Sequence, residues 1–116
     1  MALFKRKHIK KIFEGRKTQT RRIHKHTWKV GKVYGIRDRW YSKAEGYILI
    51  TRKFRQKLGD ISPEGIKREG YNSLKQFRRE WEEIHGKGSW NPEQVVIVYE
   101  FKVVNDGKVK VSSGKL

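Results

Sequence analysis

Apolar residues recur along the chain with two different periods, and each change of period marks the end of an element. Between residues 4 and 14, apolar side chains return every three or four positions, with lysine and arginine between them. This spacing predicts an amphipathic helix, and Gly15 follows at the place of a helix C-cap. Runs rich in β-branched and aromatic residues predict strands at 33–37, 47–54 and 95–104, and the threonine-rich segment 16–23 predicts a short, irregular one.

Two helix starts lie between the last two long strands. Ser62 followed by Pro63 is typical of an N-cap and a first helical position, and Ser73 with Gln76 forms a capping box. The strands are mostly not joined by crossover helices. The pattern therefore predicts an α+β fold: a small, partly closed β-barrel with a basic N-terminal helix and two short helices inserted before the last long strand.

The chain of 116 residues is long enough for one domain with a modest core. We place that domain at 1–104 and interpret 105–116 as a C-terminal hairpin and tail, because Asn105-Asp106-Gly107 predicts a turn. The N-terminus runs into charge without an apolar signal segment, and no cysteine is present. We expect a cytoplasmic, soluble monomer that uses neither disulfides nor thiolate chemistry.

Positive charge is concentrated in the first half of the chain. Lysine and arginine outnumber aspartate and glutamate by 29 to 12, which gives a net charge of +17. Residues 1–58 hold 19 cations and 3 anions (+16), whereas residues 59–116 hold 10 and 9 (+1). Such a chain should fold with one strongly positive face, as polyanion binders do. We expect nucleic acid rather than a membrane as the partner, because the cations are spread over several elements.

Two types of site suggested by short motifs do not fit the surrounding sequence. His24 and His26 could present two imidazoles from one strand, but no cysteine or carboxylate lies nearby, so we expect no metal and no other cofactor. Gly15-Arg16-Lys17-Thr18 mimics the end of a phosphate-binding loop. That motif requires an earlier glycine, where this chain has Lys10, and the helix should follow the motif instead of preceding it.

The four tryptophans divide between packing and exposed roles. Trp81 lies on the apolar stripe of a predicted helix, and Trp90 is expected to pack over the barrel end. Trp28 and Trp40 lie among cations in loop-like segments, where an aromatic ring could stack a base of single-stranded nucleic acid; packing on the rim is the alternative. The cations assigned to this candidate nucleic-acid interface are Arg16, Lys17, Arg21, Arg22, Arg39, Arg52, Lys53 and Arg55.

Residues 15–22, G-R-K-T-Q-T-R-R, combine hydroxyls and cations without an acid. A threonine hydroxyl is a nucleophile only when a base takes its proton, and Lys17 could do so if the neighbouring arginines lower the pKa of its amine. In a regular strand, Lys17 and Thr20 point to opposite faces, so they meet only if the backbone turns between them. The residues alone favour phosphate binding.

The stretch Gly15–Arg21 resembles the signature of the ASCH domain, a small β-barrel related to the PUA RNA-binding fold. The similarity in the order of elements extends over about residues 3–104 and ends with the closing strand around Tyr99-Glu-Phe-Lys102. One branch is more similar than the rest: the small bacterial amidohydrolases that remove the acetyl group of N4-acetylcytidine. Their pattern Lys-Thr-x-Thr-x-Arg is matched by Lys17, Thr18, Thr20 and Arg22.

The resemblance to that branch implies an active site made of Lys17, Thr20 as the nucleophile, and a glutamate that falls on Glu69. Glu69 ends a predicted helix just before Gly70, where the helix dipole disfavours an anion, and a carboxylate in such a place can shuttle protons. The cationic load exceeds what an uncharged nucleoside requires and suits a polynucleotide.

Three hypotheses follow, with RNA or a modified nucleoside as the partner. The first is an RNA-binding ASCH protein of RNA metabolism, with a basic cleft centred on Lys17–Arg22. The second is an amidohydrolase acting on acetylated cytidine, free or in RNA, through Lys17, Thr20 and Glu69. The third is a ribonuclease with Lys17 or His24 as its base.

Overall fold

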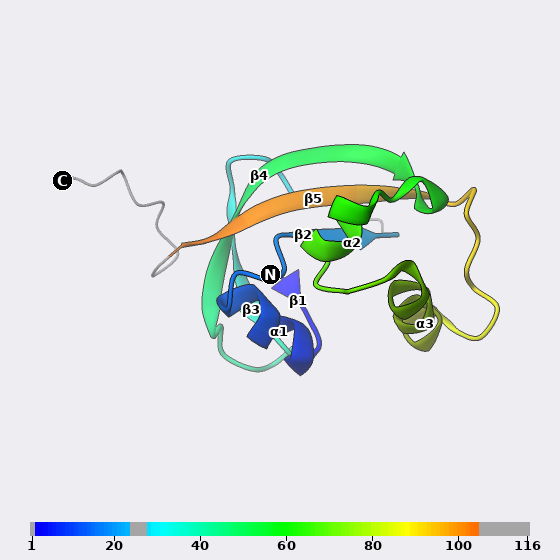
Figure 1. Cartoon of the computed structure of the whole chain (residues 1–116). Helices are drawn as coiled ribbons and strands as arrows, with labels where there is room; N and C mark the ends of the chain where they lie inside the picture. The colour runs from blue at the N-terminus through cyan, green and yellow to red at the C-terminus, as the bar shows by residue number, and fades with distance from the viewer. Residues whose placement is uncertain (1, 24–27, 105–116) are drawn as a thin grey trace.

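In the part of the chain that the structure describes, one mixed sheet of five strands organises the fold (Figure 1). The computed structural model describes residues 2–23 and 28–104. The strands are β1 (Ala2–Leu3), β2 (Gln19–Arg22), β3 (Val33–Arg37), β4 (Gly46–Lys57) and β5 (Val95–Val104). Their order is β1-β3-β4-β5-β2, with β1 parallel to β3 and the other neighbours antiparallel. The long β4–β5 ribbon curves across the molecule, so that the sheet forms a half-barrel.

Among the described residues, three α-helices pack against this sheet: α1 (Arg6–Phe13), α2 (Pro63–Arg68) and α3 (Leu74–His85). A short 3-10 turn, η1 (Leu58–Asp60), precedes α2. The predicted α+β class, the basic N-terminal helix and the two helices before the last strand are confirmed. No helix in the described residues is both long and apolar enough to cross a membrane.

The predicted caps of α2 and α3 are confirmed. Ser62 Oγ accepts from the backbone N–H of Gly65 at 3.0 Å, and Ser73 Oγ accepts from the N–H of Gln76 at 3.1 Å. Each cap of this kind stabilises its helix by about 1 kcal/mol. These two bonds fix where α2 and α3 begin, and so which of their residues face the sheet.

Alternate residues of β5 face two separate apolar cores. Tyr99 and Phe101 belong to a cluster that includes Ile9 and Ile12 of α1. Val96 and Val98 belong to a second cluster, built with residues of α2 and α3. The two faces of β5 therefore serve two cores, one closed by α1 and the other by α2 and α3. β2 pairs with β5 at the edge of the sheet and lies between the two cores.

β2 is shorter than the strand predicted at 16–23. The backbone N–H groups of Arg16 and Lys17 both donate to the carbonyl of Lys11, at 2.9 and 3.2 Å, which folds this segment back onto the end of α1. Regular pairing with β5 begins only at Gln19. Lys17 therefore lies outside the alternation of strand faces that the sequence had implied.

β1, Ala2–Leu3, was not predicted, because two residues are too short to show a period. The hairpin predicted at 105–111 and the pair His24 and His26 lie outside the described residues.

Candidate active site

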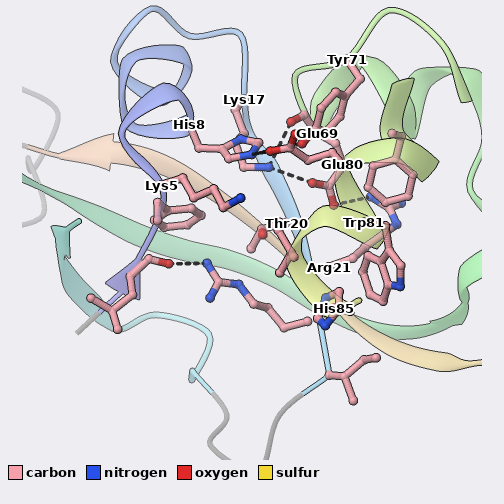
Figure 2. A pocket seen from close by; sticks show the side chains of 16 residues that line it. Lys5, His8, Lys17, Thr20, Arg21, Glu69, Tyr71, Glu80, Trp81 and His85 are labelled. Atoms are coloured by element: carbon pink, nitrogen blue, oxygen red, sulfur yellow. Dashed lines mark hydrogen bonds and ion pairs between the residues drawn. The ribbon is translucent and has the colours of Figure 1, made fainter. Parts of the chain in front are cut away.

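A cavity of about 280 Å³ opens beside β2, where the N-terminal segment and α1 approach α3 (Figure 2). Its walls come from β1, α1, β2, the C-terminal end of α2 and α3. β2 is an edge strand of the sheet, and within the described ranges 2–23 and 28–104 no further strand covers this side of it. Lys17, Thr20 and Glu69 line the cavity together, and Arg21 and Arg22 line it as well.

A buried ion network joins Lys17 and Arg21 to Glu69. Lys17 Nζ donates to Glu69 Oε1 at 2.8 Å and to the Glu69 carbonyl at 3.0 Å, and Arg21 Nη1 donates to Glu69 Oε2 at 3.1 Å. These three side chains are at most 4% exposed. Arg21 also donates to Gln19 Oε1 and Gln56 Oε1. Buried charge is costly unless it is paired and hydrogen-bonded, and this network meets both conditions.

The position of Glu69 follows from the end of α2. Glu69 is the C-cap, and Gly70 after it adopts a left-handed backbone with φ of 94°. A Cβ on Gly70 would lie 2.9 Å from Cδ of Lys11, whose Nζ donates to the Gly70 carbonyl at 2.8 Å. The N–H of Thr18 donates to the carbonyl of Arg68 at 2.7 Å. The end of α2 is thereby tied to the segment that carries Lys17.

Burial lowers the pKa of the Lys17 amine from its usual value near 10.5. Glu69 acts in the opposite direction, by charge and by hydrogen bond, whereas the nearby cations Arg22 and Lys11 lower the pKa further. The predicted direction is confirmed, although desolvation is a larger cause than the neighbouring arginines. A lysine held in this way gives up its proton more readily and is a better base near neutral pH.

Thr20 lies at the centre of the cavity, with Lys17 and Glu69 above it and His85 below it in Figure 2. It pairs with Tyr99 on β5 and is 5% exposed. Within residues 2–23 and 28–104, no hydrogen bond to its hydroxyl is formed, so the hydroxyl remains available to a ligand. Because Lys17 precedes β2 instead of belonging to it, Lys17 and Thr20 line one cavity despite their odd spacing.

A second polar cluster, formed by His8, Tyr71 and Glu80, lines the same cavity. Glu80 Oε1 lies 3.3 Å from His8 Nε2, Tyr71 Oη lies 3.0 Å from the same nitrogen, and Lys7 Nζ donates to Glu80 Oε2 at 2.6 Å. In the tautomer protonated at Nε2, this nitrogen donates to Glu80, because a carboxylate only accepts. Sequence reasoning missed this cluster because His8 was counted with the apolar stripe of its helix. The available signal in the sequence was a histidine and a glutamate at positions where their predicted helices face the core.

Burial and the charge of Lys17 lower the pKa of His8 from 6.5 to about 4. Between these values the unfolded chain binds a proton that the folded chain does not. Acidification from pH 7 to pH 4 is therefore expected to lower the free energy of unfolding of wild type. This loss should exceed the loss in His8→Gln, which lacks this titration, by up to about 3 kcal/mol. Urea unfolding of both proteins across this range measures the difference. Parallel pH dependences would contradict the buried, neutral state of His8.

The other predicted interface residues divide between the surface and the core. The side chains of Arg16, Arg39 and Arg52 are 60%, 64% and 63% exposed, and Lys53 and Arg55 on β4 are also exposed. Trp40 is 74% exposed in the β3–β4 loop; its neighbour Tyr41, at 81%, was not singled out from the sequence. The candidate interface is thus not one cleft, because Lys17, Arg21 and Arg22 line the cavity while the other cations lie outside it.

Trp28 lies in the first core instead of presenting an open face. It is 7% exposed, and its ring centroid lies 4.8 Å from that of Tyr99 and 6.2 Å from that of Phe4. The packing interpretation, which the sequence left open for Trp28, is the one that the structure favours. The stacking role predicted for Trp28 conflicts with this burial.

Comparison with known proteins adds the fold family. No family model and no curated protein matches the sequence. An ASCH domain from Lactobacillus crispatus superposes with a TM-score of 0.63 at 20% identity, covering 84% of this chain and 70% of that one. The chain has the ASCH-domain fold. A mutant ASCH protein from Zymomonas mobilis gives a TM-score of 0.62 at 14% identity, covering 90% and 73%.

A third structural neighbour is an Enterococcus faecalis protein described by the family model DUF984. It has a TM-score of 0.63 at 22% identity, covering 83% of this chain and 69% of that one. The ASCH resemblance drawn from Gly15–Arg21 is thus confirmed at the level of the fold. Identities this low show the fold alone, so the N4-acetylcytidine branch stays a prediction.

Proposed function

We propose that the cavity hydrolyses the amide of an N-acylated nucleobase, with N4-acetylcytidine as the expected substrate. The observation that carries this proposal is the convergence of Lys17, Thr20 and Glu69 on one cavity, with Lys17 Nζ 2.8 Å from Glu69 Oε1. A nucleophile, a base and a group that orients the base are the parts that acyl transfer requires. Phosphate binding by Lys17 and Arg21 is disfavoured, because Glu69 already engages both cations.

The reaction divides into two acyl transfers. The neutral amine of Lys17 takes the proton of the Thr20 hydroxyl, and Oγ1 attacks the acetyl carbon. The C–N bond then breaks, the N4 nitrogen takes the proton back from Lys17, and cytidine leaves an acetyl ester on Thr20. Water, deprotonated by Lys17, attacks that ester; the Thr20 oxygen recovers the proton and acetate is released. Glu69 holds Lys17 in place and stabilises its ammonium form in both halves.

Incubation of the protein with N4-acetylcytidine is the direct test. We expect stoichiometric release of acetate and cytidine, measured by chromatography. A wild-type protein that is folded and releases no acetate at saturating substrate would overturn the proposal. The ribonuclease hypothesis is tested in the same assay format by replacing the substrate with single-stranded RNA and following strand cleavage.

The exposed cations favour a second candidate function, binding of single-stranded RNA. Arg52, Lys53 and Arg55 follow one another along β4 and are all exposed, and the exposed aromatic pair Trp40 and Tyr41 follows Arg39. Phosphate contacts by lysine and arginine combined with base stacking on aromatic rings are the usual means of holding a single strand. The substrate of the cavity could then be a modified base within an RNA chain.

Salt dependence tests this second function. Removing one phosphate-binding cation lowers the slope of log affinity against log salt by about 0.7 for a single strand, so the triple variant Arg52→Gln, Lys53→Gln, Arg55→Gln should lower it by about 2. The control variant changes three exposed cations around α3 to glutamine: Lys75, Arg79 and Lys87. Fluorescence titration with a labelled RNA strand measures both. Equal slopes in the two variants would contradict binding through β4.

A further inference from the structure

Arg22 presents a guanidinium to the cavity with most of its donors unused. Its Nη2 donates to the carbonyl of Leu3 at 2.8 Å. A guanidinium has five N–H donors, and no other hydrogen bond or ion pair of this side chain is formed within the described part of the chain. Arg21 is different, because its Nε donates to Gln56 and its Nη1 to Gln19 and Glu69. Of the two arginines at the cavity, Arg22 is the one whose side chain is not already paired with a carboxylate, and it has more donors left for a ligand.

Two aromatic rings hold this guanidinium in place. The Arg22 Cζ lies 4.7 Å from the ring centroid of Phe4 and 5.0 Å from that of Trp28. Both rings belong to the first apolar core and are at most 7% exposed. The cation–π contacts and the Leu3 bond restrict the guanidinium before any ligand arrives. Donors fixed in advance stabilise developing charge without a cost of reorganisation.

Arg22 lies beside Thr20 on one face of β2. The two residues are two positions apart, so their side chains point the same way and their Cα atoms are about 6.6 Å apart. Their partners on β5 are Tyr99 and Ile97, which also share a face. Both Thr20 and Arg22 line the cavity. A ligand in the cavity that is in contact with the Thr20 hydroxyl therefore lies on the same side of β2 as the Arg22 side chain.

We propose that Arg22 donates to the acyl oxygen of the bound amide and stabilises the oxyanion that forms when Thr20 attacks. This inference rests on the proposed amide hydrolysis and adds a catalytic residue to it. The guanidinium stays protonated throughout: negative charge appears on the oxygen as the C–O double bond opens, and disappears when the C–N bond breaks. In this proposal, the Trp28 ring positions the Arg22 guanidinium.

The test compares Arg22→Met, Arg22→Lys and the control Arg79→Met, which removes an exposed cation of α3. Loss of an oxyanion donor lowers kcat by about 10²–10³-fold, and KM should change little because the charge develops only in the transition state. Arg22→Lys keeps the charge and should recover part of the rate. Thermal unfolding confirms that each variant is folded. An unchanged kcat in Arg22→Met, or a change confined to KM, would overturn the inference.

A binding measurement separates this inference from the proposed function. The probe is a phosphonate analogue of N4-acetylcytidine, in which a tetrahedral anionic phosphorus replaces the acetyl carbon. We expect wild type to bind it more tightly than cytidine, and Arg22→Met to lose that preference. If wild type turns over nothing but binds the analogue through Arg22, amide hydrolysis fails and the catalytic role of Arg22 fails with it, which leaves Arg22 as an anion-binding residue of the cavity. If turnover is normal and Arg22→Met retains both kcat and analogue affinity, hydrolysis stands and the inference fails. A wild type with neither property overturns both.

Discussion

Thr20→Ala is expected to lower kcat for acetate release by at least about 10³-fold, because it removes the atom that forms the acyl intermediate. KM should change much less, since the small hydroxyl contributes little to ground-state binding of the nucleoside. The hydroxyl forms no hydrogen bond within the described residues, so its loss should leave the fold intact. Steady-state acetate release against substrate concentration measures both constants.

Thr18→Ala is the matched control for this change. Thr18 belongs to the same segment, but it lines two other hollows and does not line the candidate active site. The two variants remove the same chemical group two residues apart. A rate within about threefold of wild type is expected for Thr18→Ala, whereas equal losses in the two variants would contradict a specific role for Thr20.

Glu69→Gln is expected to lower the free energy of unfolding by about 3–5 kcal/mol, because it leaves the buried Arg21 guanidinium without a counter-charge and removes the carboxylate that stabilises the ammonium form of Lys17. Lys17 and Arg21 both direct donors to this carboxylate, and all three side chains are buried. Glutamine keeps the size of the side chain and one acceptor oxygen, so packing is preserved while the charge is lost. Urea unfolding at neutral pH measures the change through the midpoint, with the slope as a check on two-state behaviour.

Glu83→Gln provides the comparison for the loss of charge alone, since Glu83 is an exposed residue of α3. Surface substitutions of this kind change stability by about 0.5 kcal/mol or less. A Glu69→Gln protein that is destabilised by less than about 1 kcal/mol, as for a solvent-exposed ion pair, would contradict the buried network described for the active site.

Local signals in the sequence were sufficient for the helices and the long strands. Ser62 and Ser73 predicted the starts of α2 and α3 because an N-cap depends on residues within one turn of it. The strands at 33–37 and 95–104 were predicted with the bounds that the structure shows, since their apolar runs are long enough to stand out. These elements depend little on what packs against them.

The geometry of the candidate active site depends on contacts that no local pattern encodes. The turn that frees Lys17 from strand alternation is formed with the carbonyl of Lys11 and does not appear as a motif in residues 15–22. The pairing of His8 with Glu80 joins residues 72 positions apart. Only the family resemblance pointed to Glu69, which is 52 positions from Lys17. Charged residues that pair inside the protein are indistinguishable, in sequence, from charged residues on its surface.

Covalent trapping of the acyl intermediate tests the central claim most directly. The protein is mixed with N4-acetylcytidine in a single turnover, quenched in acid and digested, and the peptide carrying residues 18–21 is examined by mass spectrometry. The account predicts an acetyl ester on Thr20 that forms and decays at the rate of turnover and is absent from Thr20→Ala. Acetate release with no modification of Thr20, or an acetyl group carried by another residue at the same rate, would contradict it.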